Sequence, residues 1–545
     1  MPGSRSASAG GKRSRGGCIT CKIRRVKCDE TFPACVRCVQ TGRTCDGYAS
    51  STSHQSRRAL ADAVRQLRVA GPASRVLGKP VAADDAACFD FFRHCTSAMT
   101  GSVLPAPFWE CQLLQIASGE RAVWKVVVAL GALHRRWEYS NSRTPAAVAA
   151  RQRDGPDAIA RFTRQAASHY YGAISLAKEI RDPATLAVLS AALAAAAQLA
   201  GLWAECQIHL HAGLRLVQDQ PDPGAVGDLV PSLERIDLQA MFFEDVRAPY
   251  AYGAVAELAY AACGPHSAWP GAELASLNEA ALVVLRLVRD FMLVAGAAEH
   301  GILGLEGLLA ALGRLGEDAR RWEAALGRLL AGGRRRRCGE QEERTVLVMR
   351  LYHAVLMQCL TAGIIGPETR WDAGLRWFVQ AVELAEEIAR ATPSAMPFFM
   401  SLEPGVATPL FLTVVRCRHP LVRRRALYLL GRMNRQEGIW NCGAAARVAE
   451  QCVALEEEGL GIELPLRVDD ADLAGLVVDA DAPVVVDADG YAPAWPGGWP
   501  NVPEKQRLLQ TSLLVDLEAS VIDLTMHVTG EDGLGTVTRS LSIDI

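Results

Sequence analysis

Six cysteines near the start of the chain recur in two halves with the same spacing. The two halves read Cys18-x₂-Cys21-x₆-Cys28 and Cys35-x₂-Cys38-x₆-Cys45. Cysteines three positions apart lie on one face of a helical turn, so each Cys-x₂-Cys pair can face one metal ion. A tetrahedral zinc ion takes four thiolates, and six thiolates serve two ions only if two sulfurs bridge both metals. The repeat therefore predicts a cluster of two Zn²⁺ ions.

Two other uses of these cysteines fit less well. A disulfide scaffold belongs in an oxidising compartment, but the first residues, Met1-Pro-Gly-Ser-Arg-Ser, lack the apolar segment of a signal peptide. We therefore expect the chain to stay inside the cell. A single zinc site with four ligands would leave two cysteines of a regular repeat unused.

The remaining ten cysteines have no metal-ligand spacing, and we expect them to be buried thiols. They are Cys88, Cys95, Cys111, Cys206, Cys263, Cys338, Cys359, Cys417, Cys442 and Cys452. His209 and His211 lie close to Cys206 in the sequence, but only His209 shares a helical face with it. Two converging ligands do not make a zinc site, so ordinary packing is the expected use of these side chains.

Positive charge is concentrated around the six N-terminal cysteines. Residues 1–60 hold twelve Lys or Arg and three Asp or Glu, a net charge of +9, whereas the whole chain has a net charge of −2. The other residues therefore carry −11. A compact basic module joined to an acidic body is typical of proteins that bind nucleic acid.

Four cations lie between the second and third cysteines, in the segment Lys22-Ile-Arg24-Arg25-Val-Lys27. Such side chains can neutralise DNA phosphates, and Arg or Lys can donate to O6 and N7 of guanine. Free carbonyls at the end of a short helix can accept from the N4 amino group of cytosine. The segment therefore predicts a surface that reads a few G·C pairs; an exposed basic face or a nuclear-import signal is the alternative.

The segment 18–48 closely resembles the DNA-binding module of fungal zinc-cluster transcription factors. The resemblance covers the six cysteines, the basic run, Pro33 two positions before Cys35, and the Gly42-Arg43 and Gly47-Tyr48 pairs. It implies that Pro33 shapes the loop between the two halves.

The same resemblance implies a role for each ligand and for several cations. One zinc would be held by Cys18, Cys21, Cys28 and Cys35. The other zinc would be held by Cys35, Cys38, Cys45 and Cys18, so that Cys18 and Cys35 are the bridging ligands. Base contacts at a CGG-type triplet are implied for Arg24 and Arg25, and phosphate contacts for Lys22, Lys27 and Arg43.

Composition and turn-forming residues divide the chain into six expected parts. These are a disordered basic tail at 1–15, the zinc cluster at 16–47, a linker at 48–83, a helical domain at 84–460, an acidic segment with Pro, Gly and Trp at 461–502, and a C-terminal segment at 503–545 that packs on the helical domain. A short helix is expected at 57–69 within the linker. It is too short for a dimerising coiled coil, which needs about three or four heptads.

Apolar residues between 84 and 460 recur with helical spacing, and no stretch alternates for long enough to predict a sheet. At 123–137 they predict a helix with one apolar stripe. The expected fold is a small zinc-cluster module plus a large all-α domain, with helix pairs in an α-solenoid-like stack. The stretch at 184–203 approaches membrane-spanning length, but it is mostly alanine, so we expect a buried helix and no membrane partner.

Parts of this helical region resemble the regulatory domain often fused to this kind of zinc cluster. The resemblance rests on Phe108-Trp109, on 129–134, and above all on 416–440. Within 416–440, the run Arg423-Arg424-Arg425 would ordinarily be an exposed helix face. The resemblance implies instead that these arginines have a structural role in the helical domain.

The acidic segment allows two interpretations. Eight acids and one Arg lie between Glu463 and Gly490, with Tyr491, Trp495 and Trp499 following. Acidic residues interleaved with apolar and aromatic ones are typical of transcriptional activation segments, but an acidic surface insertion between helices has the same composition.

Together these features predict a nuclear, zinc-dependent, sequence-specific DNA-binding transcription regulator of the RNA polymerase II type. Its expected partners are double-stranded DNA and the transcription machinery or co-regulators, and a homodimer is compatible with the sequence. The alternative is a helical scaffold or co-regulator whose zinc module contacts proteins. No phosphate-binding glycine loop, Gly-x-Ser-x-Gly or His-Glu-x-x-His motif occurs, so we do not expect an enzyme.

Overall fold

A computed structural model describes most of the chain. The described residues are 21, 26, 28, 29, 35–41, 75, 76, 79–102, 104–141, 152, 157–220, 226–243, 269, 273–332, 339–391, 398–469, 478, 479, 493–516, 521–529 and 536–544. The chain divides into two compact units, Met1–Arg65 and Gln66–Ile545. The expected tail at 1–15 and the expected helix at 57–69 lie outside the described residues.

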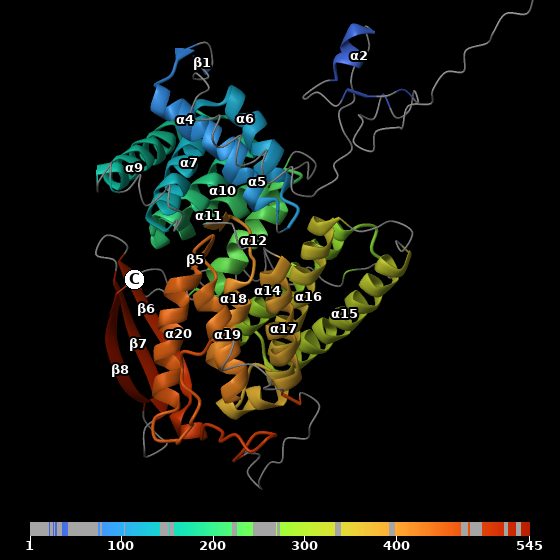
Figure 1. Ribbon diagram of the computed structural model, residues 1–545, viewed down its shortest axis with the longest axis vertical. Helices are drawn as coiled ribbons and strands as arrows, with labels where there is room; N and C mark the ends of the chain where they lie inside the picture. The colour runs from blue at the N-terminus through green and yellow to red at the C-terminus, as the bar shows by residue number, and fades with distance from the viewer. Residues whose placement is uncertain are drawn as a thin grey trace, which may run out of the picture. The chain divides into compact units, whose positions relative to one another are not determined.

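The N-terminal helices of the second unit, drawn from blue to green in Figure 1, surround one hydrophobic core. They are α4 (Ala83–Phe91), α5 (Ser97–Thr100), α6 (Leu113–Gly119), α7 (Arg121–Asn141), α9 (Asp157–Ala177), α10 (Pro183–Ala200), α11 (Trp203–Gln218) and α12 (Leu229–Met241), with π-helical turns at Phe92–Thr96 and Phe108–Gln112. Two short paired strands, β1 (Arg75–Val76) and β2 (Lys79–Pro80), precede them.

Helix α7 lies at the centre of this core. The sequence predicted one apolar stripe, but the side chains from Ala122 to His134 are buried on all sides, apart from the partly exposed Lys125. Gly131 permits this close packing, because a Cβ atom there would lie 2.0 Å from the carbonyl oxygen of Cys88 in α4. The helix was therefore predicted correctly, and its contacts extend over more of its surface than expected.

The alanine-rich stretch forms α10, whose residues from Ala187 to Leu199 are all buried. Asp182 caps its N-terminus by accepting from the backbone N–H of Thr185, and Gly201 ends it in the left-handed conformation with φ of 76°. By length and composition, Pro183–Ala200 and Glu340–Ala362 could each cross a membrane, and 72% of each apolar window is buried inside the protein. Core helices of soluble proteins meet the same criterion, so this burial agrees with the packed helix that we expected at 184–203.

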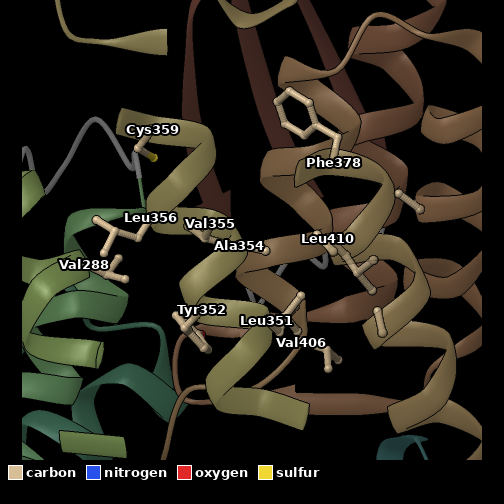
Figure 2. Close-up of a cluster of buried hydrophobic side chains, with 14 of the residues drawn as sticks. Val288, Leu351, Tyr352, Ala354, Val355, Leu356, Cys359, Phe378, Val406 and Leu410 are labelled. Carbon is tan, nitrogen blue, oxygen red and sulfur yellow. The ribbon is translucent and has the colours of Figure 1, made fainter. Parts of the chain in front are cut away.

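A second and larger core is enclosed by the helices that follow. They are α14 (Leu277–Glu299), α15 (Leu305–Gly332), α16 (Glu340–Ala362), α17 (Leu375–Ala391), α18 (Ala407–Arg416), α19 (Pro420–Arg432) and α20 (Cys442–Glu456), with 3₁₀ turns at Glu368–Gly374 and Glu504–Gln506. Figure 2 shows α16 inside this core, with Val288 of α14 and Phe378 of α17 among the surrounding side chains. The predominantly helical body is thereby confirmed.

Two small sheets interrupt the helices. In the first, β3 (Phe399–Ser401) pairs in parallel with β4 (Arg435–Glu437), which pairs antiparallel with β5 (Trp440–Asn441). In the second, β6 (Leu508–Asp516), β7 (Val521–Thr529) and β8 (Thr536–Asp544) form an antiparallel meander. The sequence did not predict these strands, and a regular α-solenoid-like stack of helix pairs is not confirmed.

The C-terminal sheet, red in Figure 1, shares the second core with the helices. One face of β7 is formed by Ile522, Leu524 and Met526, which are buried, whereas Asp523 between them is exposed. This alternation is the period-two pattern of a half-buried strand. The C-terminal residues therefore complete the hydrophobic core.

The last part of the acidic segment also packs on the helices. Trp495 is buried in the second core, and its indole N–H donates to the carbonyl oxygen of Arg418 at 3.1 Å. Asn501, which follows, donates to the carboxylate of Asp372 at 2.9 Å. These contacts favour a packed insertion for residues 493–501, while most of the acids at 461–490 lie outside the described residues.

The arginine run of α19 is not an exposed face. Arg423 pairs with Glu456 and Arg424 with Glu457 (2.7 Å), and the side chains of both arginines are at most 2% exposed. Arg425 pairs with Glu386 of α17 at 2.7 Å. The structural role implied for this run is therefore confirmed.

Seven of the eight described cysteines of the body are buried, as expected. Burial raises the pKa of the thiols of Cys206, Cys359 and Cys417 to about 12, so they stay protonated at neutral pH. The prediction was wrong for Cys111, which is exposed because its π-helical turn buries Phe108 and Trp109 instead.

Candidate metal centre

Four of the six N-terminal cysteines fall among the described residues, and all four are buried. They are Cys21, Cys28, Cys35 and Cys38, which with Val26 form a small cluster of their own. Cys18 and Cys45 lie outside the described residues. Among the described residues of this segment only Val26 packs against the four cysteines, and burial of cysteines with so little apolar contact is typical of metal ligands.

Three of the sulfur atoms have the spacing of ligands on zinc. The Sγ atom of Cys21 lies 3.7 Å from that of Cys35 and 3.8 Å from that of Cys38. Zn–S bonds of about 2.3 Å in a tetrahedron place neighbouring sulfurs about 3.8 Å apart, whereas a disulfide needs about 2.05 Å. The distances therefore fit metal ligands and exclude a disulfide in either pair.

The three sulfurs converge closely enough to share one zinc ion. All three lie within 4.8 Å of one another, which a single tetrahedral ion also permits. The resemblance placed Cys21 and Cys38 on different ions that share Cys35. Cys28 is buried in the same cluster but is not among the three converging sulfurs.

A short helix, α2 (Val36–Gln40), positions the second Cys-x₂-Cys pair. The backbone N–H of Cys38 donates to the Sγ atom of Cys35 at 3.3 Å, so the first turn of the helix helps to orient that sulfur. At the other end of the helix, the hydroxyl of Thr41 donates to the carbonyl oxygen of Arg37 at 2.8 Å. The helix thus holds Cys35, the sulfur that the resemblance makes a bridging ligand, next to Cys38.

Asp29 is a positioning residue to which the sequence assigned no role. Its carboxylate accepts from the backbone N–H groups of Val36 at 3.0 Å and Arg37 at 2.8 Å, so it caps the start of α2. The contact joins the residue after Cys28 to the helix that carries Cys38. Asp29 therefore ties the first half of the repeat to the second.

We expect Asp29→Ala to destabilise the metal-bound module by about 1 kcal/mol, the usual cost of losing a helix cap. Zinc retention should fall about fivefold in a competition titration with a chromophoric chelator, because that free energy is linked to metal binding. Asp29→Asn is the matched control: it keeps an acceptor oxygen, and its zinc retention should fall less than that of Asp29→Ala. Equal zinc retention by Asp29→Ala and the unaltered chain would show that the cap contributes nothing.

The rest of the described chain offers no comparable group. Among the described residues, only Cys21, Cys35 and Cys38 form a set of three potential ligands with converging donor atoms. Near Cys206, the Nε2 atom of His209 is hydrogen-bonded to the hydroxyl of Tyr170 at 2.8 Å. This hydrogen bond agrees with the expected use of His209 in ordinary packing.

Comparison with known families agrees with this geometry. Residues 16–55 match the family model described as the fungal Zn(2)-Cys(6) binuclear cluster domain. The chain carries a domain of this family. The match includes all six cysteines and the basic run between the second and third, so it covers Cys18 and Cys45 as well as the described ligands.

Segments of the chain are also similar to curated proteins, which are fungal transcription regulators. A 161-residue segment is 36% identical to the aspercryptin biosynthesis cluster-specific transcription regulator atnN of Emericella nidulans, over 27% of this chain and 25% of the relative. A 42-residue segment is 50% identical to the transcriptional regulatory protein moc3 of Schizosaccharomyces pombe, over 8% of each chain. A 57-residue segment is 44% identical to the transcription regulator lscL of Purpureocillium lilacinum, over 10% of this chain and 14% of the relative.

These similarities have a limited extent. The matched segments span a quarter or less of the length of the three relatives. No solved structure matches the chain. The relatives are named as transcription regulators, which agrees with the expectation that the chain is not an enzyme.

The sequence assigned five cations of this domain to DNA. Lys22, Arg24, Arg25, Lys27 and Arg43 all lie outside the described residues. They fall within residues 16–55, so the Zn(2)-Cys(6) domain includes them. Their individual roles stay predictions.

Proposed function

We propose that this protein is a nuclear transcription regulator of the RNA polymerase II type that binds DNA through its Zn(2)-Cys(6) domain and reads CGG-type triplets in the major groove. The observation that carries the proposal is the match of residues 16–55 to that domain. The sulfur distances around Cys21 support it because they fit zinc ligands. The net charge of +9 over residues 1–60 supports binding to a polyanion.

Two zinc ions would be held by six thiolates, with Cys18 and Cys35 as the shared ligands. Cys21 and Cys28 would complete the first site, and Cys38 and Cys45 the second. The buried state of the four described ligands agrees with a structural role, in which the coordination sphere is closed to water. Zinc in such a site supplies folding free energy and no reaction chemistry.

Base reading is assigned to Arg24 and Arg25, and phosphate binding to Lys22, Lys27 and Arg43. Arginine can donate two hydrogen bonds to O6 and N7 of guanine, which distinguishes G·C from the other pairs. Lysine at a phosphate contributes affinity without sequence preference. Loss of a base-reading arginine should therefore reduce sequence discrimination, whereas loss of a phosphate-binding residue should reduce affinity for all sequences.

We expect Arg25→Ala to lower discrimination at one base pair of a CGG-type triplet by about 1 to 3 kcal/mol. The measurement is the affinity of the full-length, zinc-loaded protein for a CGG duplex and for duplexes in which each base pair is changed in turn. Lys27→Ala is the matched control, since it should weaken binding to all these duplexes alike. If Arg25→Ala also weakened all of them equally, Arg25 would be a phosphate contact.

The helical body would control the activity or the partners of the DNA-binding domain. The similarity to the regulator from Emericella nidulans supports this. The aligned segment has 161 residues, so it is much longer than the 16–55 segment and includes residues outside it. Transcription machinery or co-regulators are the proposed protein partners. A homodimer is proposed as one form that binds DNA, and half-site spacing in the bound DNA would report it.

A further inference from the structure

A cavity of about 940 Å³ lies within the helical body. Its walls come from α7, α9 and α10 on one side and from β5, α20, β6 and β7 on the other. In Figure 1 the first group belongs to the blue and green helices and the second to the orange and red elements. The volume is in the upper part of the range of about 300 to 1,000 Å³ typical of small-molecule sites.

The walls of the cavity are rich in aromatic side chains. These include Trp137, Tyr170, Trp203, Phe243, Phe411 and Trp440. Flat rings of this kind provide a large apolar contact area for an aromatic or aliphatic molecule. The body of a ligand that fits here is therefore apolar.

The charged residues of the cavity wall all have the same sign. Arg136, Arg164 and Arg447 line it, and no Asp or Glu is among the described lining residues. A wall whose charged residues are all arginines, beside a low-dielectric interior, favours an anionic ligand and disfavours a cationic one.

Most polar side chains of the wall already have partners inside the protein. The amide of Gln436 donates to the carbonyl oxygen of Gly438 at 2.8 Å and accepts from Asn441 at 3.1 Å. Asn141 donates to the carbonyl oxygen of Trp137 at 3.0 Å. These groups shape the wall, and a ligand does not need to satisfy them.

Three other polar groups of the wall have no hydrogen-bond partner among the described residues. They are both amide atoms of Gln198, the indole N–H of Trp203 and the Nε atom of Arg447. Gln198 is 1% exposed and stands in the otherwise apolar second half of α10. Buried polar groups in proteins are nearly always hydrogen-bonded, so unpaired groups on both sides of the cavity favour the binding of a polar molecule there.

We propose that this cavity binds an organic carboxylate with an aromatic or aliphatic body. Arg447 supplies the positive charge for the carboxylate, and Gln198 and Trp203 supply the neutral donors. The aromatic wall covers the apolar body of the ligand. This site lies in the helical body and does not depend on DNA binding, so failure of either proposal leaves the other standing.

The test uses the full-length, zinc-loaded protein and three probes with one naphthalene body. They are 2-naphthylacetate, 2-(2-naphthyl)ethanol and 2-(2-naphthyl)ethylamine, which carry an anionic, a neutral and a cationic head. Calorimetric titration should show binding in the order carboxylate, alcohol, amine, and the carboxylate should raise the unfolding temperature of the body. Equal affinity for all three probes, or no binding of the carboxylate, would overturn the proposal.

Variants connect the binding to the cavity. Arg447→Gln should lower the affinity for the carboxylate about tenfold, the effect of losing one charge-assisted hydrogen bond, and should leave the alcohol unchanged. Arg215→Gln is the control, because Arg215 is an exposed residue of α11 outside the cavity. It should change neither the affinity for the carboxylate nor the affinity for the alcohol. Ala444→Trp should block all three probes by filling the space. Unchanged carboxylate affinity in either Arg447→Gln or Ala444→Trp would contradict the assignment.

Discussion

Removal of zinc from the full-length protein should unfold the Zn(2)-Cys(6) domain and leave the helical body folded. The domain has a core of four buried cysteines and Val26 among its described residues, so little apolar burial is available to hold it without metal. Structural zinc in small domains contributes about 10 to 16 kcal/mol, far more than such a core supplies. Hydrogen exchange should therefore show full loss of protection over residues 16–55 after treatment with a strong chelator.

The body provides the internal control for this experiment. Its described residues contain no set of three converging metal ligands, and two large hydrophobic cores hold its helices together. Amides of α10 and α16 should keep their protection in the chelated protein. Metal analysis before chelation should give two zinc ions per chain. Simultaneous unfolding of residues 16–55 and the body, or one ion per chain, would contradict the cluster as described.

Glu456→Gln should destabilise the body by about 3 to 5 kcal/mol, the usual cost of breaking a buried ion pair. The carboxylate of Glu456 accepts from Arg418 at 2.9 Å, from Arg423, and from the backbone N–H of Leu508 at 2.7 Å. The side chains of Glu456 and both arginines are 0% exposed. Without the negative charge of Glu456, less of the positive charge of the two buried guanidinium groups is neutralised. Denaturant unfolding should therefore give a lower free energy of unfolding.

Glu450→Gln is a matched control on the same helix. Glu450 pairs with Arg467 at 2.7 Å, but the side chain of Arg467 is 82% exposed, so water replaces the lost interaction. The change in unfolding free energy should be much smaller than for Glu456→Gln. Equal losses in the two variants would show that burial of the Glu456 network has no special effect.

The pH dependence of the Glu456 contribution follows from its pKa. Burial by itself would raise the pKa of Glu456, but the charges of Arg418 and Arg423 outweigh it and lower the pKa to about 2. The pKa of Glu456 is thus lower in the folded protein than the value of about 4.3 for an unfolded Glu. Its contribution to stability is therefore complete above about pH 4.3 and is lost as the pH falls towards 2. The difference between the unaltered protein and Glu456→Gln should therefore shrink in acid.

The cysteine cluster could be predicted from the sequence because metal coordination constrains the spacing of its ligands along the chain. The cap from Asp29 was not readable, since its partners Val36 and Arg37 lie seven and eight residues away and no local pattern joins them. The sulfur distances could not be predicted either, because they depend on how the two halves fold together.

The helices of the body were readable from their periodicity, but several of their contacts were not. The run of three arginines in α19 has the local pattern of an exposed face, and its acidic partners lie more than thirty residues away. The C-terminal sheet was not predicted because only one of its neighbouring strands shows a clear strand pattern. Its middle strand alternates clearly at Ile522, Leu524 and Met526, but the neighbouring strand Leu508–Asp516 does not alternate regularly.

Selection of bound fragments from random DNA tests the central claim most directly, because it needs no assumption about the target. The full-length protein with two zinc ions bound should enrich sequences that contain a CGG-type triplet at moderate salt. The enrichment should disappear after chelation and in an Arg24→Ala, Arg25→Ala double variant. Recovery of no preferred sequence by the zinc-loaded protein would contradict the account.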